Sequence, residues 1–251
     1  MKNLHRMKKM TVYLAFTALS VSSFAQEGEE ELEKKNIIKL NLPALAFKNI
    51  SIQYERAVGE RIAVGGTFRL MPKSKLPFRG TVSDLADDAE LDRQLANTEV
   101  GNFAIMPEMR YYVGKKGVFQ GFYLGPFLNF SRYNASLLYE YDDLLTTKTI
   151  PLNGNVNTIT GGLMFGAQWK LTNSLSLDWW ILGPNYGVSR GDLTGKQTLN
   201  ASEQQSLRNE LEDLDIPLTK FTYQVDGNGA AIDFKGPWAG VRAGICVGIN
   251  F

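Results

Sequence analysis

Residues 238–251 alternate between two kinds of side chain, and this alternation constrains the fold more than any other feature of the sequence. One parity is apolar throughout, from Ala239 to Phe251, whereas the other is small and polar and contains Arg242 and several glycines. A period of two is typical of a β-strand whose two faces meet different surroundings. In a membrane barrel the apolar face meets lipid and the polar face lines the lumen. In a soluble barrel the apolar face would instead fill the interior.

The N-terminus has the three parts of a secretory signal peptide. A basic segment precedes an uncharged run over residues 10–24, and Ser23-Phe24-Ala25 forms a small-x-small cleavage site. We expect residues 1–25 to be removed, with an N-terminal membrane anchor as the alternative. Removal takes away four of the 27 basic residues and no acidic residue, which leaves 23 bases against 26 acids and a net charge of −3. This balance gives no reason to expect a nucleic-acid partner.

The mature sequence excludes helical membrane spans. No later segment contains the roughly 18 consecutive apolar residues that a spanning helix requires. A membrane protein without such a helix must be a closed barrel, because lipid offers no hydrogen-bond partners to free backbone groups. The single cysteine, Cys246, rules out an internal disulfide, and we interpret it as a small residue that faces the lumen.

Seven further segments show the same alternation, so the sequence predicts eight strands of about the length that a tilted membrane strand needs. The predicted strands cover residues 36–47, 50–58, 62–71, 103–113, 119–133, 156–171, 175–189 and 238–251. The Glu-rich residues 26–35 precede them as a solvated acidic tail, for which docking in the periplasm is the alternative.

The lengths of the connections support a membrane topology. Residues 72–102, 134–155 and 190–235 break the alternation and are expected to be long loops, whereas the turns after the second, fourth and sixth strands are short. Bacterial outer-membrane barrels have short periplasmic turns and long extracellular loops. We therefore predict that residues 36–251 form an eight-stranded antiparallel transmembrane β-barrel with this arrangement.

Two local patterns qualify this prediction. Four prolines fall inside predicted strands, where they cannot donate a ladder hydrogen bond, and we expect β-bulges near the outer rim to accommodate them; they are Pro43, Pro107, Pro126 and Pro184. Within the last long loop, Ser202-x-x-Gln205 resembles a capping box, and leucines follow at helical spacing at positions 207, 211 and 214. This helix would cover the barrel mouth or, alternatively, present a groove to a partner.

The inward parity of the strands carries both signs of charge. Side chains just fill an eight-stranded barrel, so we expect these residues to form a lumen network of ion pairs and hydrogen bonds, with a conducting pore or ligand site as the alternative. The predicted members are Lys39, Glu55, Arg69, Glu108, Arg110, Lys170, Asp178 and Arg242.

Several stretches resemble a family of small outer-membrane β-barrels of Bacteroidetes that is described as a domain of unknown function. The opening NIIKLNLPALAFKNISIQYERAVGERIAVGGTFRLMPKSKLPF (36–78) carries the resemblance, together with MPEMRYYVGKKG (106–117), GFYLGPFLNFSRY (121–133) and GICVGINF (244–251). The resemblance implies an outer-membrane location and insertion by the barrel-assembly machinery through the final strand, with Phe251 as the assembly signal. It implies no activity.

No pattern in the sequence indicates catalysis. The mature chain contains no histidine, and no nucleophile elbow, phosphate-binding glycine loop or metal-ligand spacing is present. We expect neither an enzyme nor a cofactor or metal. The first functional hypothesis is a barrel that displays extracellular loops for envelope integrity or for an extracellular partner that binds residues 72–102 and 190–235. The alternatives are a narrow channel or small-ligand carrier that uses the lumen, and a secreted lipocalin-like barrel with an apolar ligand inside.

Overall fold

The computed structural model describes residues 34–75, 97–143, 146–212 and 218–251. The expected signal peptide, nearly all of the acidic tail and most of the expected loop at 72–102 lie outside the described residues. Leu214, the last leucine of the expected helix, lies outside them as well.

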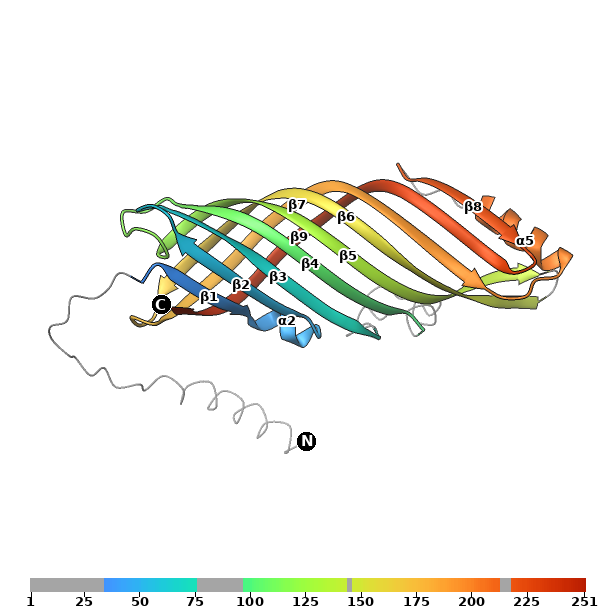
Figure 1. Ribbon diagram of the computed structural model, residues 1–251, viewed down its shortest axis with the longest axis horizontal. Helices are drawn as coiled ribbons and strands as arrows, with labels where there is room; N and C mark the ends of the chain where they lie inside the picture. The colour runs from blue at the N-terminus through green and yellow to red at the C-terminus, as the bar shows by residue number, and fades with distance from the viewer. Residues whose placement is uncertain (1–33, 76–96, 144–145, 213–217) are drawn as a thin grey trace, which may run out of the picture. The chain divides into compact units, whose positions relative to one another are not determined.

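Eight antiparallel strands form a closed ring, in which each pairs with the next and the first pairs with the last. They are β1 (Asn36–Asn41), β2 (Ile50–Ala57), β3 (Ile62–Lys75), β4 (Glu99–Tyr112), β5 (Gly121–Asp143), β6 (Thr146–Lys170), β7 (Leu175–Lys196) and β9 (Gly229–Asn250). The ring is drawn in Figure 1 and confirms the predicted eight-stranded antiparallel barrel.

The short turns gather at the end of the barrel where β1 begins and β9 ends. The backbone N–H of Asn36 donates to the carbonyl of Phe251 at 3.0 Å, and that of Phe251 donates back at 2.9 Å. Residues 58–61, 113–120 and 171–174 connect strands at this same end (Figure 1). The sequence predicted all three of these turns.

The first strand is shorter than the alternation predicted. It ends at Asn41, and α2 (Leu42–Ala46) replaces the expected continuation to Phe47. Pro43 stands in the first turn of this helix, where its missing N–H has no intrahelical partner to lose, and the Asn41 side chain accepts from the backbone N–H of Ala44 at 3.1 Å. Pro43 therefore ends the strand and requires no bulge.

The prediction of a loop over residues 134–155 is wrong, because β5 and β6 continue through this region as a paired hairpin. Their register is unbroken from Gly121 opposite Gln168 to Asp143 opposite Thr146. The inward parity is apolar here and contains Ile150 and Leu152, both buried. The prediction looked for apolar residues on the outward parity, and because this hairpin has polar residues there, it missed a strand pair that runs beyond the predicted membrane span.

The region 190–235 is also more regular than expected. β7 continues to Lys196, α5 (Ala201–Glu212) follows, and β8 (Lys220–Asp226) adds a ninth strand to the edge of β9. The helix has a capping box, but it is formed by Asn200 and Glu203 and not by Ser202 and Gln205. The backbone N–H of Glu203 donates to Asn200 Oδ1 at 2.9 Å, and the N–H of Asn200 donates to Glu203 Oε2 at 2.7 Å.

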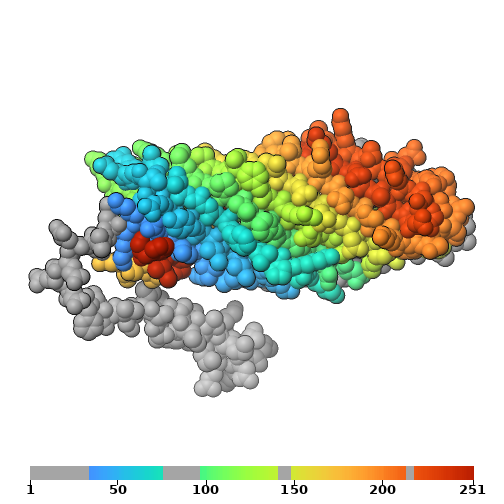
Figure 2. Space-filling model, viewed as in Figure 1, coloured from blue at the N-terminus to red at the C-terminus, as the bar shows by residue number. Residues whose placement is uncertain are grey.

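Helix α5, β8 and the neighbouring strand ends share a second apolar core, and we call this part the cap. Leu207 and Leu211 of α5 are buried in it, which agrees with the predicted helix packing at the barrel mouth. The orange and red atoms of this region gather at the end of the barrel away from the short turns (Figure 2). The core consists of Ile150, Leu152, Leu199, Leu207, Leu211, Val225 and Ala230.

The remaining prolines lie within strands and affect the ladder in two ways. Between β4 and β5 the register is constant, but no pairs are formed where Pro107 and Pro126 stand. In β7 a bulge at Ile181 and Leu182 shifts the register against both neighbours, two residues before Pro184. Only the expectation for Pro184 thus matches a nearby bulge.

The outer surface of the ring is apolar, as the alternation predicted, whereas the interior contains buried polar and charged side chains together with an apolar cluster that includes Phe119, Phe127 and Met164. Every strand of the ring exposes large apolar side chains; Ile249 is 62% exposed and Phe122 66%. Adjacent inward residues such as Asn250 and Tyr123 are buried. The lipocalin-like alternative required the apolar parity of the strands to face inward, and the structure contradicts it because that parity is exposed. Neither described helix is long and apolar enough to cross a membrane.

Candidate functional site

Six of the eight charged residues predicted for the lumen meet in one buried network. They come from five strands, and each is no more than 8% exposed. Because their strands tilt around the ring, residues far apart in the chain converge at one level of the barrel. The six are Lys39, Glu55, Glu108, Arg110, Asp178 and Arg242.

Lys39 of β1 joins three sides of the barrel. Its ammonium group lies 2.5 Å from Glu55 Oε2 on β2, 2.7 Å from Asp178 Oδ2 on β7 and 2.8 Å from Gln168 Oε1 on β6. Three acceptors satisfy the three N–H donors of an ammonium group. Gly248 stands opposite Lys39 on β9, and a Cβ there would lie 2.8 Å from Lys39 Cγ, so glycine leaves room for the lysine stem.

Arg110 of β4 is the centre of the network. Its Nε donates to Glu108 Oε1 at 2.6 Å, Nη1 to Asp178 Oδ2 at 2.6 Å and Nη2 to Gln53 Oε1 at 3.1 Å. The guanidinium also lies over the ring of Tyr123, 4.2 Å from its centroid. The planar fork of an arginine meets these partners with fixed directions, which lysine would not supply.

Arg242 of β9 extends the network towards the cap. Its Nη1 lies 2.5 Å from Glu108 Oε2, and its Nη2 donates to Thr67 Oγ1 at 2.7 Å. The guanidinium stacks over Trp180, with its carbon 4.0 Å from the ring centroid. Glu108 thus joins Arg242 to Arg110. Through these two residues of β4, the last strand is linked to the part of the network that contains Lys39 of the first strand.

The charges of this network balance: three cations, Lys39, Arg110 and Arg242, face three carboxylates, Glu55, Glu108 and Asp178. Taking a single charge out of water costs several kcal/mol, so a buried set is tolerated when each charge has a partner and further hydrogen bonds. The network therefore stabilises one arrangement of the interior and fills the lumen at this level. This arrangement favours a sealed barrel over a conducting pore.

The other two predicted members lie outside the network. Arg69 is half-buried, and its Nε donates to Asn102 Oδ1 at 2.8 Å. Lys170 has the inward parity but is exposed, because it is the last residue of β6 and its side chain leaves the barrel at the rim of short turns. Its assignment to the lumen is wrong.

Uncharged members complete the network, and some were missed in the site prediction. Tyr112 donates to Glu55 Oε1 at 2.8 Å, Tyr123 to Asp178 Oδ1 at 2.9 Å, and the Trp180 indole to Asp178 Oδ2 at 3.0 Å. All three share the inward parity of their strands, so alternation alone could have identified them. Tyr123 also requires Gly166, since a Cβ there would lie 2.2 Å from its hydroxyl.

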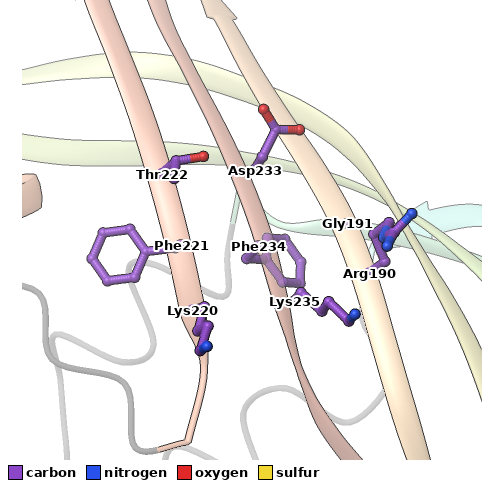
Figure 3. A pocket seen from close by; sticks show the side chains of 8 residues that line it. All are labelled: Arg190, Gly191, Lys220, Phe221, Thr222, Asp233, Phe234 and Lys235. Carbon is purple, nitrogen blue, oxygen red and sulfur yellow. The ribbon is translucent and has the colours of Figure 1, made fainter.

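A row of three cations borders the apolar belt near the cap. Arg190 of β7 pairs with Lys235 of β9, which pairs in turn with Lys220 of β8, so three like charges stand abreast. Like charges directly opposite each other destabilise a sheet unless an anion lies near them. Figure 3 shows the three side chains around a groove of about 380 Å³ that contains one carboxylate, Asp233.

An apolar cavity of about 370 Å³ lies between the strands and α5 at the base of the cap. Its lining includes Leu152, Leu211, Phe234 and Trp238. Burial, with a smaller contribution from nearby Glu210, raises the pKa of the lining residue Tyr139 above its ordinary value. Its phenol is thus neutral at physiological pH.

Two expectations concern single residues of β9 and its end. Cys246 is fully buried and faces the lumen, as the sequence indicated. Phe251 is 53% exposed, and its role as an assembly signal stays a prediction. Among the described residues, no three His, Cys, Asp or Glu side chains are grouped so that they could hold a metal ion.

These features define a β-barrel with an apolar exterior, a charge-balanced interior and a cap at one end. The chain belongs to the DUF3575 family of proteins of unknown function, whose model matches residues 11–192. The final strand, including the segment 244–251 that carried part of the resemblance, lies outside that match. The family itself thus assigns no activity to the barrel.

Two solved structures show distant similarity. The translocator domain of the autotransporter NalP from Neisseria meningitidis is 10% identical, with a TM-score of 0.33 over 98% of this chain and 96% of that one. The β domain of the Bordetella autotransporter BrkA is 9% identical, with a TM-score of 0.27 over 86% of this chain and 98% of that one. These scores are too low to support a conclusion about this chain. No curated protein matches its sequence.

Proposed function

We propose that this protein is a non-catalytic outer-membrane barrel of the small Bacteroidetes type, which holds its cap at the cell surface. The observation that carries the proposal is the apolar belt around a ring whose buried interior is polar and charge-balanced. Soluble proteins rarely expose such a continuous apolar surface, and lipid accounts for it. The proposal includes export through the N-terminal signal peptide and insertion by the barrel-assembly machinery.

The cation row marks the edge of the apolar belt on the side of the cap. On β7 Arg190 follows the exposed apolar residues Tyr186 and Val188 at the same parity, so the charge stands where the belt ends. Basic side chains at this level suit the anionic headgroups of a membrane surface. The proposed orientation places the termini and short turns in the periplasm and the cap outside, because bacterial outer-membrane barrels have short periplasmic turns and longer extracellular loops.

The cap is the part available to an extracellular partner, and we propose a role in envelope structure or surface interaction. Its strands continue the register of the barrel, so the cap is held at a fixed position relative to the membrane. Residues 190–235, one of the two regions expected to bind a partner, form much of it. The other region, 72–102, includes the end of β3 and the start of β4.

Membrane fractionation followed by gel migration with and without boiling tests the barrel and its location. We expect the chain in the outer-membrane fraction, and we expect it to migrate faster before boiling than after it. Protease added to the outside of intact cells should cleave the chain within residues 190–235. Recovery as a soluble periplasmic protein would contradict the proposal. In planar bilayers the purified barrel should show no conductance steps; regular steps would favour the channel alternative.

The cap cavity favours a second candidate function, the binding of a small neutral apolar molecule. An apolar cavity of about 150 Å³ is sufficient for benzene, so the observed 370 Å³ admits a molecule of two or three rings. Anomalous scattering from crystals soaked in 1-bromonaphthalene should place bromine between Leu152 and Trp238. Replacement of Leu193, which lines the cavity, by Trp should remove that peak, whereas Thr194→Trp on the opposite face should not. A peak on the outer belt alone would contradict this function.

A further inference from the structure

The wall of the barrel is incomplete beside α2. β1 pairs with β9 only as far as Asn41 opposite Cys246, and β8 pairs with β9 only up to Lys235. Residues 236–245 of β9 therefore have a described strand partner on the β7 side alone. On the other side of the gap, β2 accompanies β3 no further than Leu70. Unpaired backbone groups are costly in lipid, so an element other than a strand must cover this edge.

Helix α2 occupies this gap and packs against β9 and β2. Its outer side is apolar: Leu42 is 44% and Leu45 46% exposed. Between the helix and the wall lies a pocket of about 200 Å³, which we call the lateral pocket. It is lined by Asn41, Pro43, Ala44, Phe47, Asn49, Ser51, Arg69, Met106, Trp180, Val241, Arg242 and Ala243.

The lining of the lateral pocket changes from apolar to cationic. Phe47 and Val241 are 52% and 67% exposed and lie on the lipid side. Arg69 and Arg242 are half-buried and buried, respectively, and line the same pocket. An apolar entrance and a cationic interior together match a molecule with an anionic head and an apolar chain.

Two observations indicate that the cationic end can accept one more anionic partner. Arg242 is 93% buried, and although its Nη1 and Nη2 are hydrogen-bonded, its Nε has no hydrogen-bond partner among the described residues. Arg69 donates to Asn102 but has no described carboxylate within ion-pair distance, and among the described residues Arg242 forms an ion pair only with Glu108, whose charge Arg110 shares. A buried donor without an acceptor is costly, and an incoming oxyanion would satisfy the Nε of Arg242.

We propose that the lateral pocket binds the carboxylate of a fatty acid, whose chain leaves between α2 and β9 into the membrane. The volume of about 200 Å³ admits a carboxylate with a few methylene groups. The route of entry rests on the proposed membrane location, whereas the binding itself does not. Binding is therefore measured on the folded chain in detergent, where a wrong location would not affect it.

The test uses [1-¹³C]dodecanoate and the full mature chain. We expect a carboxyl resonance distinct from that of micellar dodecanoate, which saturates at one molecule per chain. Arg69→Gln should weaken binding about 10- to 100-fold, the range for loss of a hydrogen bond to a charged group. Arg132→Gln removes the same charge from an exposed site and should leave binding unchanged. Equal binding by Arg69→Gln and the unsubstituted chain would overturn the proposal.

Competition experiments test the contributions of the anionic head and of the apolar chain separately. Dodecanol lacks the anion and acetate lacks the chain, so each should compete at least tenfold less well than dodecanoate; equal competition by either would overturn the proposal. A second pair of variants leaves the arginines intact. Ala243→Phe narrows the pocket and should abolish the bound resonance, whereas Ile249→Phe, on the same face of β9 away from the pocket, should preserve it. This pair decides the question if Arg69→Gln does not fold.

Discussion

Neutralising Glu108 is the sharpest test of the lumen network. The carboxylate accepts from Arg110 at 2.6 Å, Arg242 at 2.5 Å and Gln53 at 2.6 Å. Glu108→Gln keeps the size of the side chain but leaves three buried cations against two carboxylates. It also points an amide N–H₂ at groups that are themselves donors.

The expected cost follows from the burial of all the partners. Removing one partner of a buried ion pair costs about 3–5 kcal/mol, because the other charge stays in place without compensation. For a domain of 150–250 residues each kcal/mol shifts the melting temperature by about 2–4 °C. We therefore expect the folded form to be lost at a temperature roughly 6–20 °C lower, by the same conversion.

The assay is the temperature at which the fast-migrating folded band disappears on a gel run without prior boiling. Glu140→Gln, which neutralises an exposed carboxylate on β5, is the matched control and should shift the transition by no more than a degree or two. The double substitution Glu108→Gln with Arg242→Met restores the charge balance and should recover part of the loss. A Glu108→Gln barrel as heat-resistant as the control would refute the network as a source of stability.

Other expectations concern the cap and the two faces of β9. Leu207→Ala should destabilise the cap by about 2–5 kcal/mol and expose α5 to protease, with the heat transition of the barrel unchanged; Gln205→Ala, on the exposed side, should have neither effect. Cys246 should react with maleimide only after boiling, and rapid labelling of the folded chain would contradict its place in the lumen. A spin label at Ile245→Cys in a Cys246→Ser background should collide with oxygen more often than with a water-soluble nickel complex, and the reverse would show that this face meets water.

The sequence predicted the barrel well because alternation records which face of each strand meets which surroundings. It placed Lys39, Glu108 and Asp178 inside before any contact was known, since parity is independent of register. It misplaced Lys170 because parity does not tell how far along the axis a side chain lies. Lys170 is exposed because it lies close to the rim, although it has the inward parity.

The errors in the strands have a different origin. Alternation continues through Phe47, but Pro43 fits a helix start better than a strand, and the local cap by Asn41 decides the outcome. The extension of β5 and β6 was missed because it surrounds an apolar core outside the membrane, with inward Ile150 and Leu152 and polar residues outward. In this extension the inward face is apolar and the outward face is polar, which is the reverse of the pattern that identifies a lipid-facing strand.

The position of Lys39 on the first strand has a consequence for assembly. The electrostatic balance of the interior is reached only when the opening segment of the chain, which supplies Lys39, and the closing one, which supplies Arg242, have both joined the wall. A sheet of the middle strands alone would hold Glu55 and Asp178 without their ammonium partner and would keep water around them. The charge balance of the interior therefore depends on closure of the ring, because its first and last strands supply Lys39 and Arg242.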